Sequence, residues 1–486
     1  MAMTTSRPAS LPPRAARFLA PLAPLVILLA ALPKPLSALE ASDPFDTRAI
    51  TPPRPALDLS AAEKAYLPCQ ALPSNTPYGV LEVVDLALCK NPTTREIWAI
   101  ARLQAAEVGV AQAQFLPALD GQLAANRLHG NSRSATARNA SLTLSWLLVD
   151  FGARSANLEV ARQLLSAASA TLDATVQRVF LSALQSYFNT QAARAAVTAA
   201  LESEKASRES LTAAEVRYRV GSGTPADRLQ AQTAWSQATL NRIRSEGVLR
   251  NALGRLANVM GLDANHPLRL DDIPRTLPDS GFDRDVAALI SEARRRRPEM
   301  QAAEAELKAA EAGIDYARAS GRPTISLSGG PQWEQLDGLS GQGNSIGLSV
   351  QLPIFSGFNT TYQIRAAEAR SELQAARLEN TRQEVALEVW ENYQSLSTAT
   401  QTVRSSADLL SSAEQSERVA LGRYKAGVGN ILDVLNAQSA LAAARLQRIQ
   451  AMLDWQVSRA ALARSIGALD SSLLLSVSAE QNARKP

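Results

Sequence analysis

The chain has 486 residues, of which 50 are lysine or arginine and 46 are aspartate or glutamate, so its net charge is only +4. Because this near-balance comes without a sustained basic patch, it excludes the electrostatic character of a nucleic-acid-binding protein. The two histidines, His129 and His266, lie far apart, and the sequence shows no catalytic grouping, phosphate-binding glycine loop or cluster of metal ligands. We therefore expect no enzyme activity, no catalytic residues, no metal and no cofactor.

The N-terminus predicts a secretory signal peptide over residues 1–38. Three arginines precede an apolar run over residues 18–32, and small residues follow it, which favours cleavage near Ala38 or Ala41. An uncleaved membrane anchor is the alternative, although the run is short for a membrane span. Prolines also interrupt or end the run, at Pro21, Pro24 and Pro33. The mature protein should therefore leave the cytoplasm.

Cys69 and Cys89 are the only two cysteines, and both lie in residues 39–90, which we expect to form an N-terminal extension. In an oxidising compartment the two could form a disulfide, and two unpaired thiols are the alternative. Neither cysteine follows the signal peptide directly, so we do not expect a lipid-anchored N-terminus.

Two stretches, residues 153–220 and 359–421, contain neither glycine nor proline and are rich in residues with high helix propensity. An unbroken helix over the first stretch would be about 100 Å long. Helices in globular proteins average only about 10–14 residues. The sequence therefore predicts two very long helices and a function that needs length.

Landmark residues recur at one fixed offset, which predicts an internal duplication. Asn91-Pro92 corresponds to Arg297-Pro298, and the two prolines lie 206 positions apart (298 − 92). Phe151-Gly152 and Ser356-Gly357 lie instead 205 apart, so we expect one residue to have been gained or lost near that point. The offset of 206 also joins Pro117 with Pro323, Tyr187 with Tyr393, Tyr218 with Tyr424, Gly221 with Gly427, Asp227 with Asp433, and Gly261 with Gly467.

The predicted halves are residues 91–261 and 298–467, joined by an equatorial connector over residues 262–297 and followed by a C-terminal tail over residues 468–486. In each half a helix that ends at a proline leads into two strands with a polar loop between them. A long helix, a glycine turn and a return helix follow. The predicted bounds are 95–116 and 300–320 for the first helices, 118–128, 142–148, 324–335 and 346–354 for the strands, 129–138 and 336–344 for the loops, and 226–259 and 432–466 for the return helices.

The predicted strands alternate apolar and polar residues over about ten positions, the length of a tilted strand that crosses a bilayer. A soluble sheet with one wet face is the alternative. Four strands cannot close a membrane barrel, because the smallest such barrels have about eight. An open sheet in lipid would leave its edges unpaired. If these strands lie in a membrane, several chains must therefore share one barrel: two chains would give eight strands, and three would give twelve.

The signal peptide, the duplicated halves, the Asn91-Pro92 opening and the strand pairs closed by Phe-Gly together resemble the TolC family of outer-membrane channels. The most specific motifs are the turns, RYRVGSGTPADRL at residues 217–229 and RYKAGVGNILDVLNAQ at residues 423–438. The resemblance implies a fold that is mostly α with a membrane β-barrel. It implies a homotrimer whose twelve strands form one β-barrel in the outer membrane and whose twelve helices form an α-barrel tunnel across the periplasm. An inner-membrane transporter and an adaptor would dock at the far tip, and residues 39–90 would be periplasmic.

The resemblance also assigns a periplasmic gate. In relatives a tyrosine just before the second turn and acids just after it close the tip, and these positions correspond to Tyr424 and Asp433. The second pore acid is replaced here by Asn436, and Gly429 stands where relatives carry an arginine that locks the gate. We expect that an arginine at this position would stiffen the closed state. Asp227 corresponds to the acid of the first turn.

Each of these residues also has a purely structural interpretation. Asp227 and Asp433 each lie three residues after a good N-cap residue, where a carboxylate supports the cap and offsets the helix dipole. Tyr424 could be a packing aromatic. The tip glycines would supply the conformations that helix ends require: Gly221, Gly223 and Gly427. Four aromatic residues are either girdle residues at the membrane interface or ordinary strand aromatics: Trp146, Phe151, Trp333 and Phe355.

We interpret the chain as a passive exit duct of a type I secretion system, similar to those that export toxins of the adenylate cyclase–haemolysin kind. Its partners would be two further copies of itself, an inner-membrane ABC transporter, a periplasmic adaptor, a protein toxin as cargo and outer-membrane lipid. Efflux of small molecules is the alternative within the family. A secreted coiled-coil structural protein or adhesin is the alternative outside it.

Overall fold

The computed structural model describes residues 43–55, 69, 77–129, 134–271, 285–336 and 339–469. The predicted signal peptide and most of the predicted tail lie outside the described residues. The chain divides into two units after Ala49. In the first unit, the carboxylate of Asp43 accepts hydrogen bonds from the backbone N–H groups of Thr47 (3.0 Å) and Arg48 (2.9 Å). The second unit contains all the described helices and strands.

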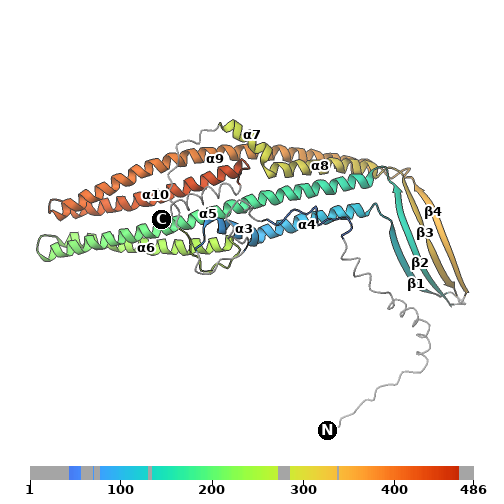
Figure 1. The fold of residues 1–486 in the computed structure, drawn as a ribbon, viewed down its shortest axis with the longest axis horizontal. Coiled ribbons are helices and arrows are strands. Elements are labelled where there is room, and N and C mark those ends of the chain that lie inside the picture. Colours follow the sequence, from blue (N-terminus) through green and yellow to red (C-terminus); the bar gives the residue numbers. More distant parts are fainter. Residues whose placement is uncertain are drawn as a thin grey trace, which may run out of the picture. The chain divides into compact units, whose positions relative to one another are not determined.

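The elements of the first half recur in the same order in the second half (Figure 1). Every described helix of the second half begins and ends 206 residues after its counterpart, as α5 and α9 illustrate (359 − 153 and 425 − 219). The structure therefore repeats with the offset that the sequence predicts. The first half contains α3 (Val80–Lys90), α4 (Pro92–Ala113), β1 (Ala118–His129), β2 (Ser134–Val149), α5 (Ala153–Arg219) and α6 (Pro225–Val259). The second contains α7 (Val286–Arg296), α8 (Pro298–Ala319), β3 (Thr324–Leu336), β4 (Leu339–Gln351), α9 (Asn359–Lys425) and α10 (Ile431–Ser465).

The two predicted long helices form without interruption. α5 and α9 each contain 67 residues, a length of about 100 Å. The strands lie at one end of these helices and the two glycine turns at the other (Figure 1). Helices α3 and α7 were not predicted, because short apolar runs do not distinguish a helix from a strand. With them, the repeated halves begin at Val80 and Val286, before the predicted starts at residues 91 and 298. Within the described residues, no helix combines the length and the apolar character needed to cross a membrane.

The turn that leads from the sheet into each long helix differs from the prediction. Phe151 and Gly152 both have positive φ angles, 52° and 103°, and in the second half Gly357 and Phe358 do, at 62° and 66°. These pairs lie 206 apart, so the expected gain or loss of one residue is wrong. The predicted offset of 205 matches Gly152 with Gly357. The backbone angles instead match Phe151 with Gly357 and Gly152 with Phe358, so the order of glycine and phenylalanine in this left-handed pair is reversed between the two halves.

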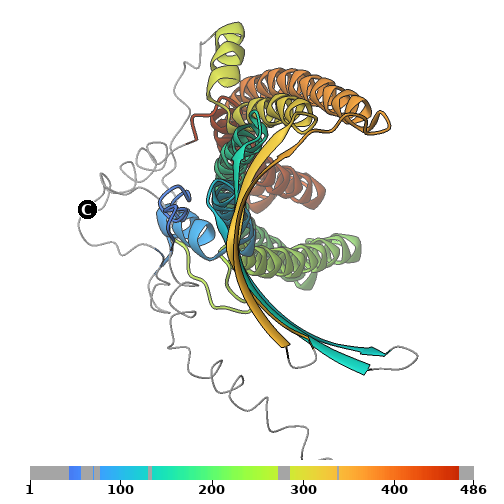
Figure 2. The same cartoon turned by 90° about the vertical axis from the view of Figure 1, so that its right-hand side faces the viewer.

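The four strands form one antiparallel sheet in the order β1-β2-β3-β4, and Figure 2 shows that this sheet is strongly curved. The strands are longer than predicted: β2 begins at Ser134, and β3 and β4 are separated only by residues 337–338. The predicted loops over residues 129–138 and 336–344 are therefore mostly wrong. The glycine- and serine-rich composition of these segments indicated loops. The hydrogen bonds between antiparallel strands join backbone groups, so they form in these segments despite that composition.

The strand register separates apolar from polar side chains. Because successive residues of a strand point to opposite faces, the register places one set of paired residues on each face. Rows on the apolar face join Leu119, Leu144, Gly329 and Ile346, and Trp146, Leu327 and Leu348. Rows on the opposite face join Ser145, Ser328 and Gly347, and Ser326 and Ser349, whose hydroxyl oxygens lie 2.7 Å apart. This is the pattern of strands with lipid on one side and water on the other.

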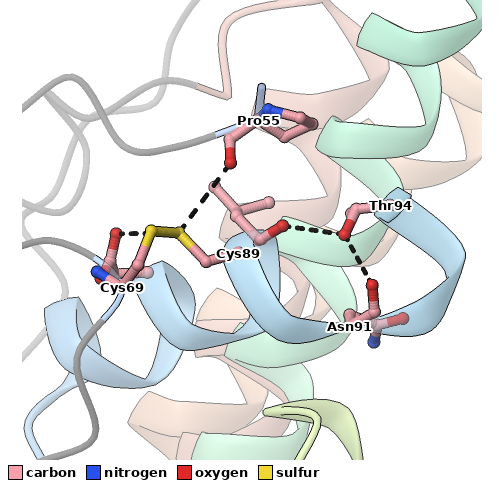
Figure 3. The surroundings of a disulfide bond; sticks show 7 residues. Pro55, Cys69, Cys89, Asn91 and Thr94 are labelled. Atoms are coloured by element: carbon pink, nitrogen blue, oxygen red, sulfur yellow. Dashed lines mark hydrogen bonds between the residues drawn. A yellow bond between two sulfur atoms is a disulfide. The ribbon is translucent and has the colours of Figure 1, made fainter. Parts of the chain in front are cut away.

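Within the second unit, two points of the N-terminal extension, Cys69 and Pro52, are attached to α3 and α4. Cys69 and Cys89 form a disulfide with a Cα–Cα distance of 5.6 Å (Figure 3). The buried carboxylate of Asp85 accepts a hydrogen bond from the Cys69 N–H at 2.6 Å. Further along, the Trp98 Nε1–H donates to the carbonyl of Pro52 at 3.0 Å. These bonds hold two separate points of the extension against the helices.

An ion network joins the junction between α7 and α8 to three helices of the second half, α8, α9 and α10. Arg297, whose side chain is 4% exposed, contacts Glu299 at 2.8 Å and also Glu388. Arg464 contacts the same two glutamates, at 3.2 and 2.8 Å. Burial alone would raise the pKa of Glu299, but hydrogen bonding and the charge of Arg297 hold it below its usual value. The positions 206 residues earlier carry neutral side chains, Asn91, Thr93, Ser182 and Asn258, so only the second half has this network.

Candidate functional site

The turns that follow α5 and α9 have the same backbone conformation. In the first turn, the N–H groups of Gly221 and Ser222 donate to the carbonyls of Tyr218 (3.1 Å) and Arg217 (2.9 Å). In the second turn, the N–H groups of Gly427 and Val428 donate in the same way to the carbonyls of Tyr424 (3.1 Å) and Arg423 (3.0 Å). This pair of bonds defines a Schellman motif, which favours glycine at its left-handed position. Gly221 and Gly427 occupy that position, with φ angles of 77° and 80°.

A second glycine of each turn allows close approach of the backbone. A Cβ atom at Gly223 would lie 3.1 Å from the Cβ of Arg217, and one at Gly429 would lie 2.9 Å from the backbone nitrogen of Tyr424. An arginine at Gly429 would therefore have to displace the second turn before it reached any partner. Stiffening of the closed state by such an arginine stays a prediction.

The acids that follow the two turns are held differently. The Asp227 N–H donates to Thr224 Oγ1 (3.2 Å) and the Thr224 N–H donates to Asp227 Oδ2 (3.0 Å), which is a capping box. In the second turn, Asn430 Oδ1 accepts a hydrogen bond from the Leu432 N–H at 3.0 Å. Asp433 takes no part in that cap. Asp433 is exposed, as is Asn436 one turn later. The capping box therefore accounts for Asp227, whereas for Asp433, in the first turn of α10, the structural interpretation that remains is its interaction with the helix dipole.

The two tyrosines also differ, since Tyr218 is 41% exposed and Tyr424 only 6%. Tyr424 packs with Ile431 and Val434 in a small apolar cluster. Arg217 from the first hairpin also contacts Tyr424. The Arg217 guanidinium lies 4.7 Å from the centroid of the Tyr424 ring, and Arg217 Nη1–H donates to the Tyr424 carbonyl at 3.0 Å.

Tyr424 stays uncharged in this environment. Burial raises the pKa of its phenol, the positive charge of Arg217 opposes that shift, and the negative charge of Asp227 adds to it. Because the unperturbed pKa of tyrosine is already about 10, the hydroxyl keeps its proton at physiological pH. The structure thus brings Tyr424, Arg217 and Asp227 together, while Asp433 lies exposed outside this group. Sequence reasoning identified Tyr424 and both acids but not Arg217.

The four aromatic residues predicted to form a membrane girdle lie at two levels of the sheet. Trp146 pairs with Leu327 on β3, and Trp333 is six residues further along that strand, a separation of about 20 Å. Phe151 and Phe355 follow β2 and β4 at the Trp146 end and are 50% and 75% exposed. Membrane barrels carry aromatic girdles on either side of an apolar band about 25 Å tall, so this spacing favours the girdle interpretation.

Comparison with known proteins supplies the decisive observation. Residues 83–262 and residues 289–468 each match the family model described as outer membrane efflux protein. The chain belongs to this family. The two matches begin 206 residues apart (289 − 83), the same offset as the helices.

Similar family members cover most of the chain. Protein CyaE of Bordetella pertussis is 33% identical over 430 residues, which are 86% of this chain and 90% of that protein. Outer membrane efflux protein BepC of Brucella suis is 26% identical, over 77% of this chain and 82% of that protein. The crystal structure of the CmeC outer membrane channel of Campylobacter jejuni superposes with a TM-score of 0.73 at 18% identity, over 82% of this chain and 89% of CmeC. The resemblance to TolC-family channels, and within them to CyaE, is confirmed.

Family membership fixes the coarse function. The chain is an outer-membrane efflux or secretion channel, and its family points to a location in the outer membrane. The family consists of channels rather than enzymes. The fold is that of the solved channels, mostly α with a sheet at one end.

Proposed function

We propose that this chain is the outer-membrane exit duct of a type I secretion system. It passively conducts an exported protein toxin from an inner-membrane ABC transporter and adaptor to the outside. The observation that carries this proposal is the identity to CyaE, 33% over 86% of the chain. BepC, a relative whose name states efflux, is 26% identical over 77% of the chain. The extended segment before the first repeat and the departures at the gate, Gly429 and Asn436, also favour protein secretion.

The sheet supports a homotrimer. β1 and β4 are the edges of a curved sheet whose apolar face carries both tryptophans, and every residue of β4 is exposed in the single chain. Unpaired backbone groups are not tolerated at an edge in lipid. A neighbouring copy that pairs its β1 with this β4 satisfies both edges. Three copies give twelve strands, which close one barrel.

The turns support a gate at the opposite end. If three copies surround one axis, three Asp433 carboxylates form a ring of negative charge, which favours cations. Asp433 is free for this role because Asn430 caps α10 without it. Asn436, one turn further on, contributes a polar but uncharged group, so the constriction would carry one ring of acids rather than two.

The secretion proposal and the efflux alternative predict different phenotypes. In the host bacterium, deletion of the gene should remove a large protein from the culture supernatant and leave drug susceptibility unchanged, and the intact gene should restore secretion. Mass spectrometry of the supernatant and growth in the presence of toxic compounds measure the two outcomes. An unchanged supernatant with raised drug susceptibility would establish efflux instead.

A further inference from the structure

Arg217 belongs to one hairpin by its backbone and contacts the other hairpin by its side chain. Its carbonyl accepts the Schellman bond of Ser222 N–H at 2.9 Å and a bond from Gly223 N–H at 3.0 Å. Its backbone is therefore part of the first turn. Its guanidinium reaches α9, where Nη1–H donates to the Tyr424 carbonyl at 3.0 Å and the group stacks on the Tyr424 ring.

The Tyr424 carbonyl is a favourable acceptor for this arginine. It lies in the last turn of α9, where carbonyls lack intrahelical partners and carry the negative end of the helix dipole. It already accepts the Schellman bond of Gly427 N–H at 3.1 Å. A charged donor makes one of the stronger kinds of hydrogen bond, so Arg217 strengthens the end of α9 and the second turn directly.

The internal repeat shows that this contact is particular to one half. The residue 206 positions after Arg217 is Arg423, which is exposed. In the first half, Tyr218 receives its cation from its own hairpin, because Arg228 lies 5.2 Å from the ring centroid. In the second half the counterpart of Arg228 is Val434, which is fully buried. The position that holds an arginine beside Tyr218 therefore holds an apolar residue beside Tyr424. The cation that stacks on the Tyr424 ring is Arg217, which belongs to the other hairpin.

We propose that Arg217 is a positioning residue that fastens the tip of the second hairpin to that of the first within one protomer, and so sets how readily the second turn and its Asp433 move away from the axis. This inference rests on the proposed channel function. A Cβ atom at Gly429 would press on the backbone of Tyr424, whereas Arg217 reaches Tyr424 from the opposite turn. Arg217 ties two hairpins of the same chain.

The test compares Arg217→Gln with Arg423→Gln in the full-length protein. Both variants remove one arginine at equivalent positions of the repeat, so they change net charge and helix propensity alike. In planar lipid bilayers we expect Arg217→Gln to raise single-channel conductance at least about threefold, because a charge-assisted bond that holds the narrow tip is lost. Arg423→Gln should conduct like the wild type. Arg217→Lys should give an intermediate value, since lysine keeps the charge but not the planar stacking.

Hydrogen exchange supplies a readout that does not depend on conduction. The N–H groups of Gly427 and Val428 should exchange about tenfold faster in Arg217→Gln than in the wild type, and Arg423→Gln should leave them unchanged. Equal exchange rates in the two variants would overturn the proposal, and so would equal conductances. If the wild-type protein forms no channels, the proposed function fails, and the exchange rates still decide whether Arg217 fastens the second turn.

Discussion

The Asp433→Asn variant is expected to lose at least about tenfold in affinity for a blocking divalent or trivalent cation, together with part of its cation selectivity. In the trimer the substitution removes three carboxylates from one level of the pore. Charges a few ångströms from a bound cation contribute on the order of 1–4 kcal/mol each near a protein surface, so the loss should exceed one power of ten. Asparagine keeps the size of the side chain. Single-channel currents in planar bilayers, titrated with the cation, measure the change.

Asp454→Asn is the matched control for this prediction. Asp454 is exposed on the same helix, 21 residues from Asp433 (454 − 433), or about 30 Å along α10. It changes the net charge of the chain by the same amount. Cation block should be normal in this variant. Normal block in Asp433→Asn, or an equal loss in both variants, would remove Asp433 from the pore lining.

Arg297→Met is expected to lower the free energy of unfolding by about 1.5–3 kcal/mol, because two half-buried carboxylates lose the hydrogen bonds of a buried cation. The substitution leaves Glu299 and Glu388 with Arg464 as their only cation in the network. Methionine fills much of the vacated volume, so the loss should come from two carboxylates that share one cation instead of two. The midpoint of chemical denaturation of the detergent-solubilised protein, compared with that of the wild type, measures the change.

Arg296→Met is the control, because Arg296 is 59% exposed and, within the part of the chain that the structure describes, pairs with Glu292 one turn earlier on α7. Pairs of this kind contribute about 0–1 kcal/mol, so this variant should unfold close to the wild type. The network also predicts an acid dependence. Since the pKa of Glu299 is lowered in the folded state, its contribution is present above the ordinary glutamate pKa and is lost as the pH falls through the lowered value. An equal shift in both variants, with no acid dependence, would contradict this role.

The long helices and the turns could be predicted because their signals are local. The absence of glycine and proline over residues 153–220 and 359–421 predicts helices wherever they pack, and α5 and α9 run through both stretches. Gly221 and Gly427 mark the helix ends because a left-handed residue is needed there whatever surrounds it. The two strands of each half could also be predicted from a local signal, the alternation of apolar and polar residues.

The remaining features depend on contacts that the local sequence does not encode. The strand ends were misjudged because ladder pairing, not composition, decides where a strand stops. The exchange of glycine and phenylalanine between Phe151-Gly152 and Gly357-Phe358 became visible only through backbone angles. An arginine precedes the tyrosine in both turns, so Arg217 was visible as a repeated residue. That it contacts Tyr424 rather than its own neighbour follows from the packing of one hairpin against the other.

The central claim is that four membrane strands per chain form a closed wall only when several copies join their edges. Electron cryomicroscopy of the full-length protein, extracted from outer membranes with detergent, tests this claim most directly. We expect three chains around one axis, with β4 of each chain hydrogen-bonded to β1 of the next, a single barrel of twelve strands and the Asp433 side chains facing the axis. A single chain with free β1 and β4 edges, or an assembly whose copies meet only through their helices, would contradict it.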